Sequence, residues 1–389
     1  MQNLLNQLDS IFDSIGFSDR LREPITESEV GERAEELPMQ LPDSVVNLYK
    51  WHDGLYSWYE GSYEGFFPGY DLLSLQEAIA QRKMLLDFSE ELQDDEFYNS
   101  AYLPIFEFQD SYFVVDCESS FSVYSIWIEG GDRPIKQYDN LEQMLQVIVD
   151  SYLCGAFYVE DEFLHENTVL FQKVRKKYIS VELRQKEEDK WSAIAEQSES
   201  FDSLADKEFF ISRLYETFDE RAIPYLQKYL SSPNTNIVSS AAFGLGELKA
   251  RESLPDLLKL LEHPEEQVRN LSTAAISEII SPADSLLLQP LLSKLEDSSS
   301  LVRIHAIEAL GQLRSEKAMP VLIRDIKQQN PNTRLHVIEA LKKIGNSECL
   351  NVIRSLIDEG LEGLELQIAE RAIGCLERKL SRGNQPLPS

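Results

Sequence analysis

The apolar residues of the chain follow a different pattern in each half. From residue 219 onward they recur at helical spacing, and the pattern as a whole returns about every 30 to 35 residues. It predicts the first helix of five units at 222–230, 253–261, 287–295, 318–326 and 349–357. After a short polar turn, it predicts second helices at 237–249, 268–280, 302–314 and 333–345, and the fifth unit is degenerate.

A proline marks the start of each of the first four units. Pro224, Pro255, Pro290 and Pro320 recur at the same place, 31, 35 and 30 residues apart. Proline is tolerated in the first turn of a helix because the backbone N–H there has no intrahelical acceptor. A single pair of helices cannot bury its apolar face, so we expect the units to stack into an all-α solenoid over residues 219–380. A flexible tail at 381–389 is expected to follow.

Two further features recur in the second helices. Small residues that are expected to let neighbouring helices approach closely stand at Ala242, Ala275, Ala306 and Gly311. An arginine that could bind Asp or Glu of the adjacent unit, or a partner, stands at Arg269, Arg303 and Arg334. With the proline and the polar turn, this pattern resembles the HEAT repeat family, in particular the short bacterial form first noted in phycobilisome lyases. The resemblance implies a solenoid whose surface binds other proteins.

The histidines of the repeat region are candidate metal ligands. His305 and His336 occupy equivalent positions in two second helices, whereas His263 lies in a turn. Repeat equivalence favours a role in stacking over metal ligation. Neither a metal nor a cofactor is therefore expected.

The first half mixes helices with strands. Helical patterns occupy 1–17, 26–37, 41–54, 74–88 and 140–158, and Thr26 with Glu29 forms a capping box. Strand patterns occupy 101–109 and 111–128, and the pair Gln109-Asp110 between them reads as a hairpin turn. Residues 1–160 are thus predicted to form an α+β domain with a small antiparallel sheet flanked by helices. A highly charged, predominantly helical connector is predicted at 161–218.

Three motifs of the first half occur in a characteristic order. After an acidic helix come "LPDSVVNLYKWHDG", then "YLPIFEFQDSYFVVDCES", and finally "NLEQMLQVIVDSY". This order resembles the SMI1/KNR4 (SUKH) superfamily, with one departure, an unusually aromatic loop after residue 54. The resemblance implies binding of other proteins. Its relatives include immunity proteins that neutralise basic toxin nucleases in bacteria, and regulators that organise signalling partners.

Charge narrows the class of partner. The formal net charge is −30, and residues 1–160 hold 31 Asp and Glu against 8 Lys and Arg. Such a surface repels nucleic-acid phosphates and anionic lipid, and favours a protein with a basic surface. An acidic surface that serves only solubility is the alternative. The four scattered cysteines, the short apolar runs and the absence of a signal peptide predict a cytoplasmic protein without membrane insertion.

The stretch "LPDSVVNLYKWHDGLYSWYEG" raises the possibility of a catalytic His52–Asp53 pair. Adjacent side chains on a helix point away from each other, and no familiar nucleophile or phosphate-binding motif occurs in the chain. Cys117 stands between Asp116 and Glu118, which would raise the pKa of its thiol. His52 is therefore expected to bond a carbonyl at the end of a helix, with Gly54 as the left-handed cap.

The aromatic stretch can form either a protein-binding patch or part of the core. Tyrosine and tryptophan dominate interface hot spots, and the interspersed glycines are typical of an adaptable loop. The candidate partner-binding residues of this stretch are Trp51, His52, Asp53, Tyr56, Trp58, Tyr59, Glu60, Tyr63, Glu64, Phe66 and Phe67.

The function predicted from the sequence is a non-catalytic protein-binding adaptor or assembly scaffold. The first alternative is an immunity protein that neutralises a basic toxin. The second alternative is a chromophore-handling protein similar to phycobilin lyases.

Overall fold

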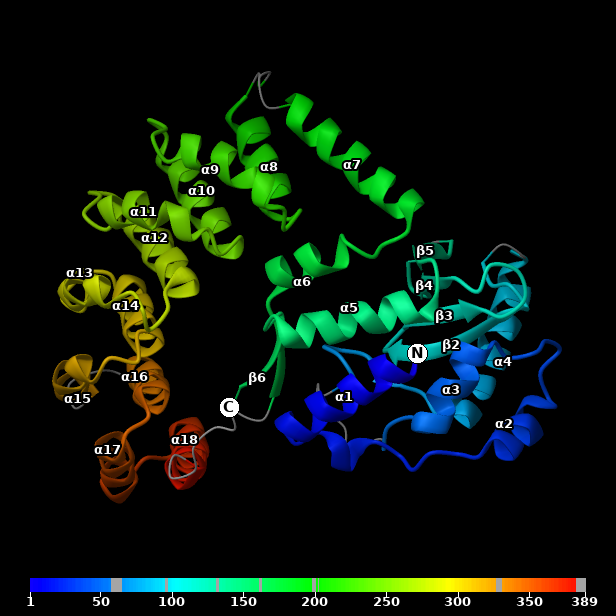
Figure 1. The fold of residues 1–389 in the computed structure, drawn as a ribbon. Helices are drawn as coiled ribbons and strands as arrows, with labels where there is room; N and C mark the ends of the chain where they lie inside the picture. The colour runs from blue at the N-terminus through cyan, green and yellow to red at the C-terminus, as the bar shows by residue number, and fades with distance from the viewer. Residues whose placement is uncertain are drawn as a thin grey trace. The chain divides into compact units, whose positions relative to one another are not determined.

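Two compact units make up the chain, Met1–Ala193 and Ile194–Ser389. The computed structural model describes residues 1–56, 65–94, 97–130, 133–160, 163–197, 201, 203–326 and 331–382. Among these residues, no helix is both long enough and apolar enough to cross a bilayer. The predicted fold classes are confirmed, because an antiparallel sheet with flanking helices precedes a helical repeat region (Figure 1).

The first unit is built on a five-stranded antiparallel sheet in the order β1-β2-β3-β4-β5. The strands are β1 Asp71–Leu72, β2 Tyr102–Phe108, β3 Ser111–Asp116, β4 Val123–Trp127 and β5 Ile135–Tyr138. Phe108 pairs with Ser111 across the two-residue turn, and Gln109 has a φ of 52°, so the predicted hairpin is confirmed. A separate hairpin of β6 (Phe157–Glu160) and β7 (Phe163–Glu166) was not predicted.

Helices cover both faces of this sheet (Figure 1). The helices of the first unit are α1 Gln2–Ile15, α2 Glu27–Ala34, α3 Asp43–Trp51, α4 Leu75–Leu92, α5 Leu141–Leu153 and α6 Thr168–Arg175, and α7 (Val181–Glu196) begins in this unit and ends beyond Ala193, its last residue. Side chains alternate along β3, so Val115 enters the main core with α1, α3 and α5. Tyr112 and Val114 enter a second, smaller core beneath α4. The predicted capping box of Thr26 and Glu29 starts α2.

The predicted connector is divided between the two units. β7 and α6 belong to the first unit, where Val174, Ile179 and Leu183 are part of the main core. α8 (Leu204–Tyr215) belongs to the second unit and packs on its first long helix, α10.

The second unit consists of helix pairs in two layers. The first helices are α9 Ile223–Tyr229, α11 Leu254–Leu260, α13 Leu288–Lys294, α15 Met319–Ile326 and α17 Ser347–Asp358. The second helices are α10 Thr235–Glu247, α12 Glu266–Ile279, α14 Ser300–Gln312, α16 Pro331–Ile344 and α18 Gly363–Arg382. Each second helix packs on the next, and together they line the inner side of the arc that this unit forms, while the first helices lie outside (Figure 1). Pro224 and Pro255 lie in first turns, as predicted.

Candidate protein-interaction surfaces

Trp51 and Phe66 lie in the core of the first unit. Trp51 is 8% exposed, and its Nε1 donates a hydrogen bond of 2.8 Å to the carboxylate of Asp9. The Phe66 ring is fully buried and lies 5.1 Å from Phe12 and 5.2 Å from Phe106. These contacts correct the prediction that Trp51 and Phe66 bind a partner.

Phe67 requires the same correction. Its side chain is buried, and its ring stacks 4.9 Å from Tyr70. The backbone turns tightly here, because a Cβ on Gly65 would lie 2.3 Å from the carbonyl oxygen of Tyr70. Gly65 thus permits the close approach that sends the neighbouring rings into the core, which is the core alternative for this part of the aromatic stretch.

His52 and Asp53 bind different segments of the first unit. The Nδ1 of His52 donates to the carbonyl of Arg22 at 2.7 Å, and its Nε2 lies 3.7 Å from the carboxylate of Asp9. The buried Asp53 binds the guanidinium of Arg33 at 2.7 Å and accepts from the backbone N–H of Leu75 at 2.8 Å. The predicted bond of His52 to a carbonyl exists, but the carbonyl belongs to another segment and not to its own helix. Both carboxylate oxygens of Asp53 are therefore bonded inside the unit. This also corrects the prediction that Asp53 belongs to a partner-binding surface.

Gly54 has the predicted left-handed backbone, with a φ of 86°, but it is not the predicted cap of the helix, because α3 ends at Trp51 and the extended His52 is its C-cap. A Cβ at this position would lie 2.4 Å from the backbone nitrogen of Ser74. Gly54 therefore lets this loop approach the start of α4 closely, which is a second reason for glycine besides the positive φ.

Among the described residues of the aromatic stretch, Tyr56 remains at the surface. Its side chain is half exposed, and the guanidinium of Arg22 lies 6.0 Å from its ring. The other predicted partner-binding residues of the loop lie outside the described residues, and these are Trp58, Tyr59, Glu60, Tyr63 and Glu64. Their role stays a prediction.

Cys117 is buried next to the sheet. Burial and the neighbouring Asp116 raise the pKa of its thiol to about 12. The thiol is therefore protonated near neutral pH, which argues against Cys117 as a thiolate nucleophile.

Arg269 joins two repeat units. Its Nε and Nη2 bind the two carboxylate oxygens of Asp297, in the next turn, at 2.8 and 3.0 Å. Its Nη1 donates to the carbonyls of His263 and Pro264, both at 2.9 Å. One guanidinium thus holds its own turn and the following turn together.

The other two arginines follow this pattern in part. Arg334 binds both carboxylate oxygens of Glu365 in the next unit, at 2.7 and 3.0 Å. The Nη1 of Arg303 donates to the carbonyls of Asp297 and Ser298 in its own turn, at 2.7 and 3.1 Å. The predicted contacts to acids of the adjacent unit are therefore present for Arg269 and Arg334. For Arg303, the described residues show bonds to its own turn and no ion pair with an acid of the adjacent unit. These bonds within the chain indicate that all three arginines stabilise the solenoid, and their contact with a partner stays a prediction.

His305 and His336 share one carboxylate. Their Nδ1 atoms donate to the two oxygens of Glu308 at 2.8 and 3.0 Å, which links α14 to α16. Burial alone would raise the pKa of Glu308, but these two hydrogen bonds outweigh it and lower the pKa to about 2. Within the described residues, no group of His, Cys, Asp and Glu is arranged to hold a metal ion.

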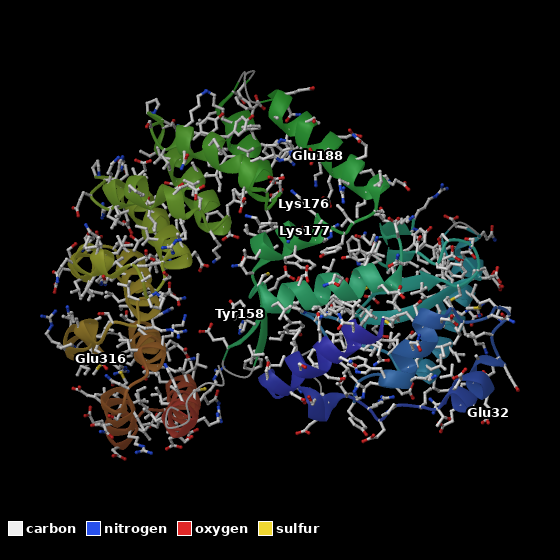
Figure 2. All side chains as sticks on the ribbon, viewed as in Figure 1. Glu32, Tyr158, Lys176, Lys177, Glu188 and Glu316 are labelled. Carbon is white, nitrogen blue, oxygen red and sulfur yellow. The ribbon has the colours of Figure 1, made fainter. Side chains whose placement is uncertain are left out.

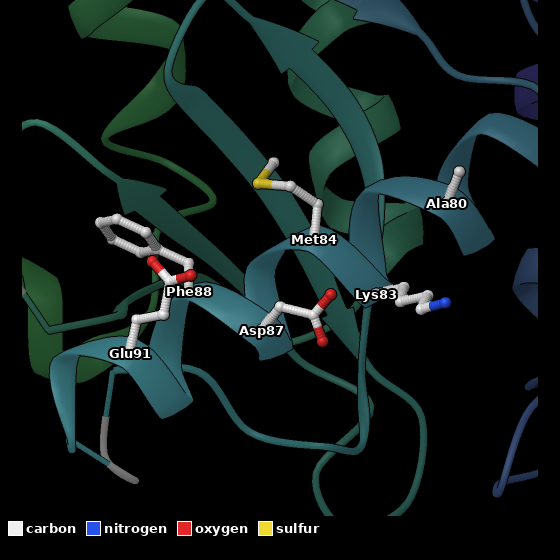
Figure 3. A pocket seen from close by; sticks show the side chains of 6 residues that line it. All are labelled: Ala80, Lys83, Met84, Asp87, Phe88 and Glu91. Carbon is white, nitrogen blue, oxygen red and sulfur yellow. The ribbon is translucent and has the colours of Figure 1, made fainter.

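The outer face of α4 carries a shallow depression of about 340 Å³. It is lined by Ala80, Lys83, Met84, Asp87, Phe88 and Glu91. Met84 and Phe88 point to one side of the helix, while Lys83 and Asp87 project to the other (Figure 3). This surface mixes apolar, basic and acidic groups and favours no single class of partner.

A larger groove lies between α2 and α3, with a cavity volume of about 510 Å³. This groove was not predicted from the sequence. The sequence carries one indication of this groove. Val30 and Ala34 are spaced to lie on one face of a helix, and Leu37 and Met39 follow them, within a segment otherwise rich in Glu.

The acidic residues are concentrated in the first unit. Residues 1–193 hold 38 Asp and Glu against 15 Lys and Arg, a formal charge of −23, and residues 194–389 hold 29 against 22, or −7. On α2 and directly after it, Glu29, Glu32, Glu35 and Glu36 are all exposed, and Glu32 lies on the outer side of the helix (Figure 2).

Comparison with protein families agrees with this division. Residues 24–147 match the family described as SMI1 / KNR4 family (SUKH-1), and residues 223–292 and 288–374 match HEAT repeats. Both resemblances drawn from the sequence are thereby confirmed. No curated protein matches the chain.

Several solved structures are similar to about half of the chain. One designed armadillo repeat protein is 18% identical, and the match covers 47% of this chain and 98% of that one, with a TM-score of 0.38. Another, solved in complex with the peptide (KR)4, is 15% identical over 47% of this chain and 98% of its own, with a TM-score of 0.38. Human deoxyhypusine hydroxylase, solved in complex with glycerol, is 22% identical over 48% of this chain and 85% of its own, with a TM-score of 0.25.

Proposed function

We propose that the protein is a non-catalytic adaptor whose acidic first unit, here called the head (residues 1–193), binds a protein with a basic surface. The solenoid of the second unit then offers its helical layers to a further protein of the same assembly. The observation that carries this proposal is the formal charge of −23 on a head that contains a SUKH-type region. A SUKH region next to HEAT repeats is in keeping with a protein-interaction scaffold or an immunity-type protein.

Several described cations of the head are paired with its own acids. Ion pairs join Arg22 to Glu77, Arg33 to Asp53, Lys50 to Glu27, Lys136 to Asp139 and Arg175 to Glu187. The remaining carboxylates leave a large negative excess at the surface. Such an excess speeds the encounter with a basic partner more than it strengthens the final complex.

The contacts of the candidate catalytic residues support a non-catalytic function. His52 is held by Arg22 and Asp9, Asp53 by Arg33 and the start of α4, and the Cys117 thiol is protonated near neutral pH. The four cysteines are free thiols, which supports the proposal that the protein works in the reducing cytoplasm.

The aromatic loop remains a proposed part of the binding surface. Tyr56 is half exposed, and Trp58, Tyr59, Glu60, Tyr63 and Glu64 follow it in the sequence. Joint replacement of Trp58→Ala and Tyr59→Ala tests this proposal. We expect weaker partner binding with an unchanged unfolding midpoint, and unchanged binding would remove the loop from the surface.

A toxin-neutralising role is the second candidate, because the same excess of carboxylates would fit the positive active-site face of a nuclease. Gene context tests it directly. A gene for a basic nuclease directly upstream, whose product the chain inhibits when the two are mixed, would support this role, and the absence of both would remove it.

The experiment that tests the adaptor function uses the full-length chain. Affinity capture from cells that express it identifies a partner, which is then purified and coupled to the chain with a reagent that joins carboxylates to lysine amines. We expect cross-links between carboxylates of the head and lysines of the partner. A partner without a basic surface, or cross-links restricted to residues 194–389, would contradict the proposal.

A further inference from the structure

The groove between α2 and α3 has an apolar floor that belongs to the core. Val30, Leu37 and Met39 form this floor, and each is less than one-tenth exposed. All three pack in the main core of the head, so the floor is held in place from below. The groove therefore exists before anything binds, which lowers the entropy cost of binding.

The walls of the groove are apolar but accessible. Ala34 on α2, Leu41 in the loop and Val46 on α3 line it and are half-buried. An apolar side chain inserted here would contact the floor and both walls, and its removal from water would favour binding.

Carboxylates form the rim. Glu27, Glu35 and Asp43 line the groove and are exposed. Glu27 pairs with Lys50 at 2.8 Å, whereas Glu35 and Asp43 form no ion pair within the described part of the chain. Their negative charge stands at the edge of an apolar surface, where a partner's cation could approach without losing all of its water.

This combination selects one kind of occupant. An acidic segment would be repelled by the rim, and a second copy of the chain would bring a net charge of −30. A polar basic segment would satisfy the rim but leave the floor uncovered. A segment with one or two apolar side chains flanked by Lys or Arg satisfies both.

We propose that the groove between α2 and α3 binds a short apolar segment of the partner that is flanked by Lys or Arg. This inference rests on the proposed adaptor function and deepens it, because it places the contact on named residues and states the chemistry of the partner's segment. The apolar side chains enter between Ala34 and Val46, and the flanking cations meet Glu35 and Asp43.

The α4 depression supplies a matched control. The groove variants are Ala34→Arg, which places a long charged side chain in the groove, and Glu35→Lys, which reverses one charge of the rim. The control variants are Ala80→Arg and Glu91→Lys, which make the same two changes on α4 at residues lining the other depression. All four side chains are at least partly exposed to water, so each variant is expected to fold. Its unfolding midpoint verifies this.

The probe is a fluorescent peptide of leucine and lysine, titrated with the full-length chain and followed by anisotropy. We expect it to bind, while peptides with leucine replaced by serine, or lysine by glutamate, bind at least about tenfold more weakly. Ala34→Arg should weaken binding about tenfold and Glu35→Lys a few-fold, whereas both α4 controls stay within about twofold of wild type.

Every outcome decides the inference. No binding of the leucine–lysine peptide, equal binding of the serine peptide, or equal effects of the α4 controls would each overturn it. So would dimerisation of the chain that Ala34→Arg abolishes, because the occupant would then be a second copy. If the identified partner binds through a basic surface and Ala34→Arg has no effect, the groove inference fails while the adaptor function stands.

Discussion

His52 and Asp53 are neighbours in the sequence, yet their side chains serve different contacts. The imidazole of His52 bonds the carbonyl of Arg22, and the carboxylate of Asp53 joins Arg33 on α2 to the first N–H of α4. A histidine next to an acid is thus not evidence of catalysis until the geometry is known. Here the two side chains connect the end of α3 to Arg22, to α2 and to the start of α4.

The bidentate pair of Arg269 and Asp297 leads to a prediction about stability. The two side chains are only 13% and 7% exposed, so Arg269→Ala leaves a largely buried carboxylate without its partner. We expect a loss of about 3 kcal/mol in the opening free energy of α12 and α14, measured by hydrogen exchange. Arg354→Ala is the control, because Arg354 and Glu377 form an exposed pair that should contribute at most about 1 kcal/mol. Equal losses of opening free energy in both variants would contradict the predicted contribution of the pair of Arg269 and Asp297.

The shared carboxylate of Glu308 leads to a prediction about pH. Burial would raise its pKa, but the bonds from His305 and His336 lower it to about 2, against about 4.3 in an unfolded chain. A lowered folded pKa means that the contribution to stability is complete above the unfolded value and is lost as the pH falls towards 2. Wild type should therefore unfold at a higher temperature than Glu308→Gln at pH 5.5, and the difference should shrink steadily as the pH falls.

The control for this series is Glu370→Gln, because Glu370 is exposed on α18. Its thermal midpoint should follow that of wild type at each pH. A difference for Glu308→Gln that is absent at pH 5.5, or that grows towards pH 2, would refute the shared-carboxylate account.

At the scale of elements, the second helices approach each other where small side chains meet. A Cβ on Gly246 would lie 2.8 Å from the Cα of Ala275, and a Cβ on Gly311 would lie 2.8 Å from the Cα of Ala340. Both contacts involve the backbone of the next second helix, which cannot rotate away. The spacing of the inner layer therefore depends on glycine at these positions.

Gly311→Ala tests this packing against intrinsic propensity. Alanine is favoured over glycine in a helix by about 1 kcal/mol, so the substitution would stabilise an open helix surface. Here the added methyl group pushes α14 away from α16, and we expect a net loss of about 1–3 kcal/mol in the free energy of unfolding. Gly374→Ala on α18 should instead stabilise, because the nearest atom to its Cβ is the guanidinium of Arg378 at 3.7 Å. Stabilisation by both changes, as measured by urea unfolding, would disprove the close-packing argument.

Most elements could be predicted from local patterns. The capping box at Thr26, the two-residue turn at Gln109 and the repeated helix pairs depend on neighbours in the sequence, and all are present. The burial of Phe66 and Phe67 depends on α1 and β2, which are distant in sequence. Local spacing could not show that Gly65 serves a tight turn and not an open loop. The β6–β7 hairpin was missed because its strands are only four residues long.

The candidate surfaces were harder to predict than the fold. Repeat alignment placed Arg269 and Arg334 next to acids of the adjacent unit, but it could not show that those bonds occupy both arginines. The groove between α2 and α3 requires two helices and a loop to come together, and no single stretch of sequence carries that information. The net charge of each unit can be summed from the sequence, because a sum over residues does not depend on the fold, and the basic partner inferred from it stays a proposal.

At the scale of the whole molecule, charge and architecture divide at the same place. The unit with the SUKH region carries −23, and the unit with the HEAT repeats carries −7. Under the proposed function, the acidic head captures a basic protein rapidly, while the solenoid offers a layered surface of lower charge. This division predicts that the association rate depends on the acids of the head and much less on those of the solenoid.

The most direct test of the acidic head is the salt dependence of the association rate with the purified partner. Between about 50 and 300 mM NaCl, where the screening length falls below 10 Å, the rate should drop at least about tenfold while the dissociation rate changes little. Joint replacement of Glu32→Gln and Glu36→Gln should slow association, whereas Glu266→Gln with Glu370→Gln should leave it unchanged. An association rate that is independent of salt, or equally sensitive to both pairs of substitutions, would contradict capture by the acidic head.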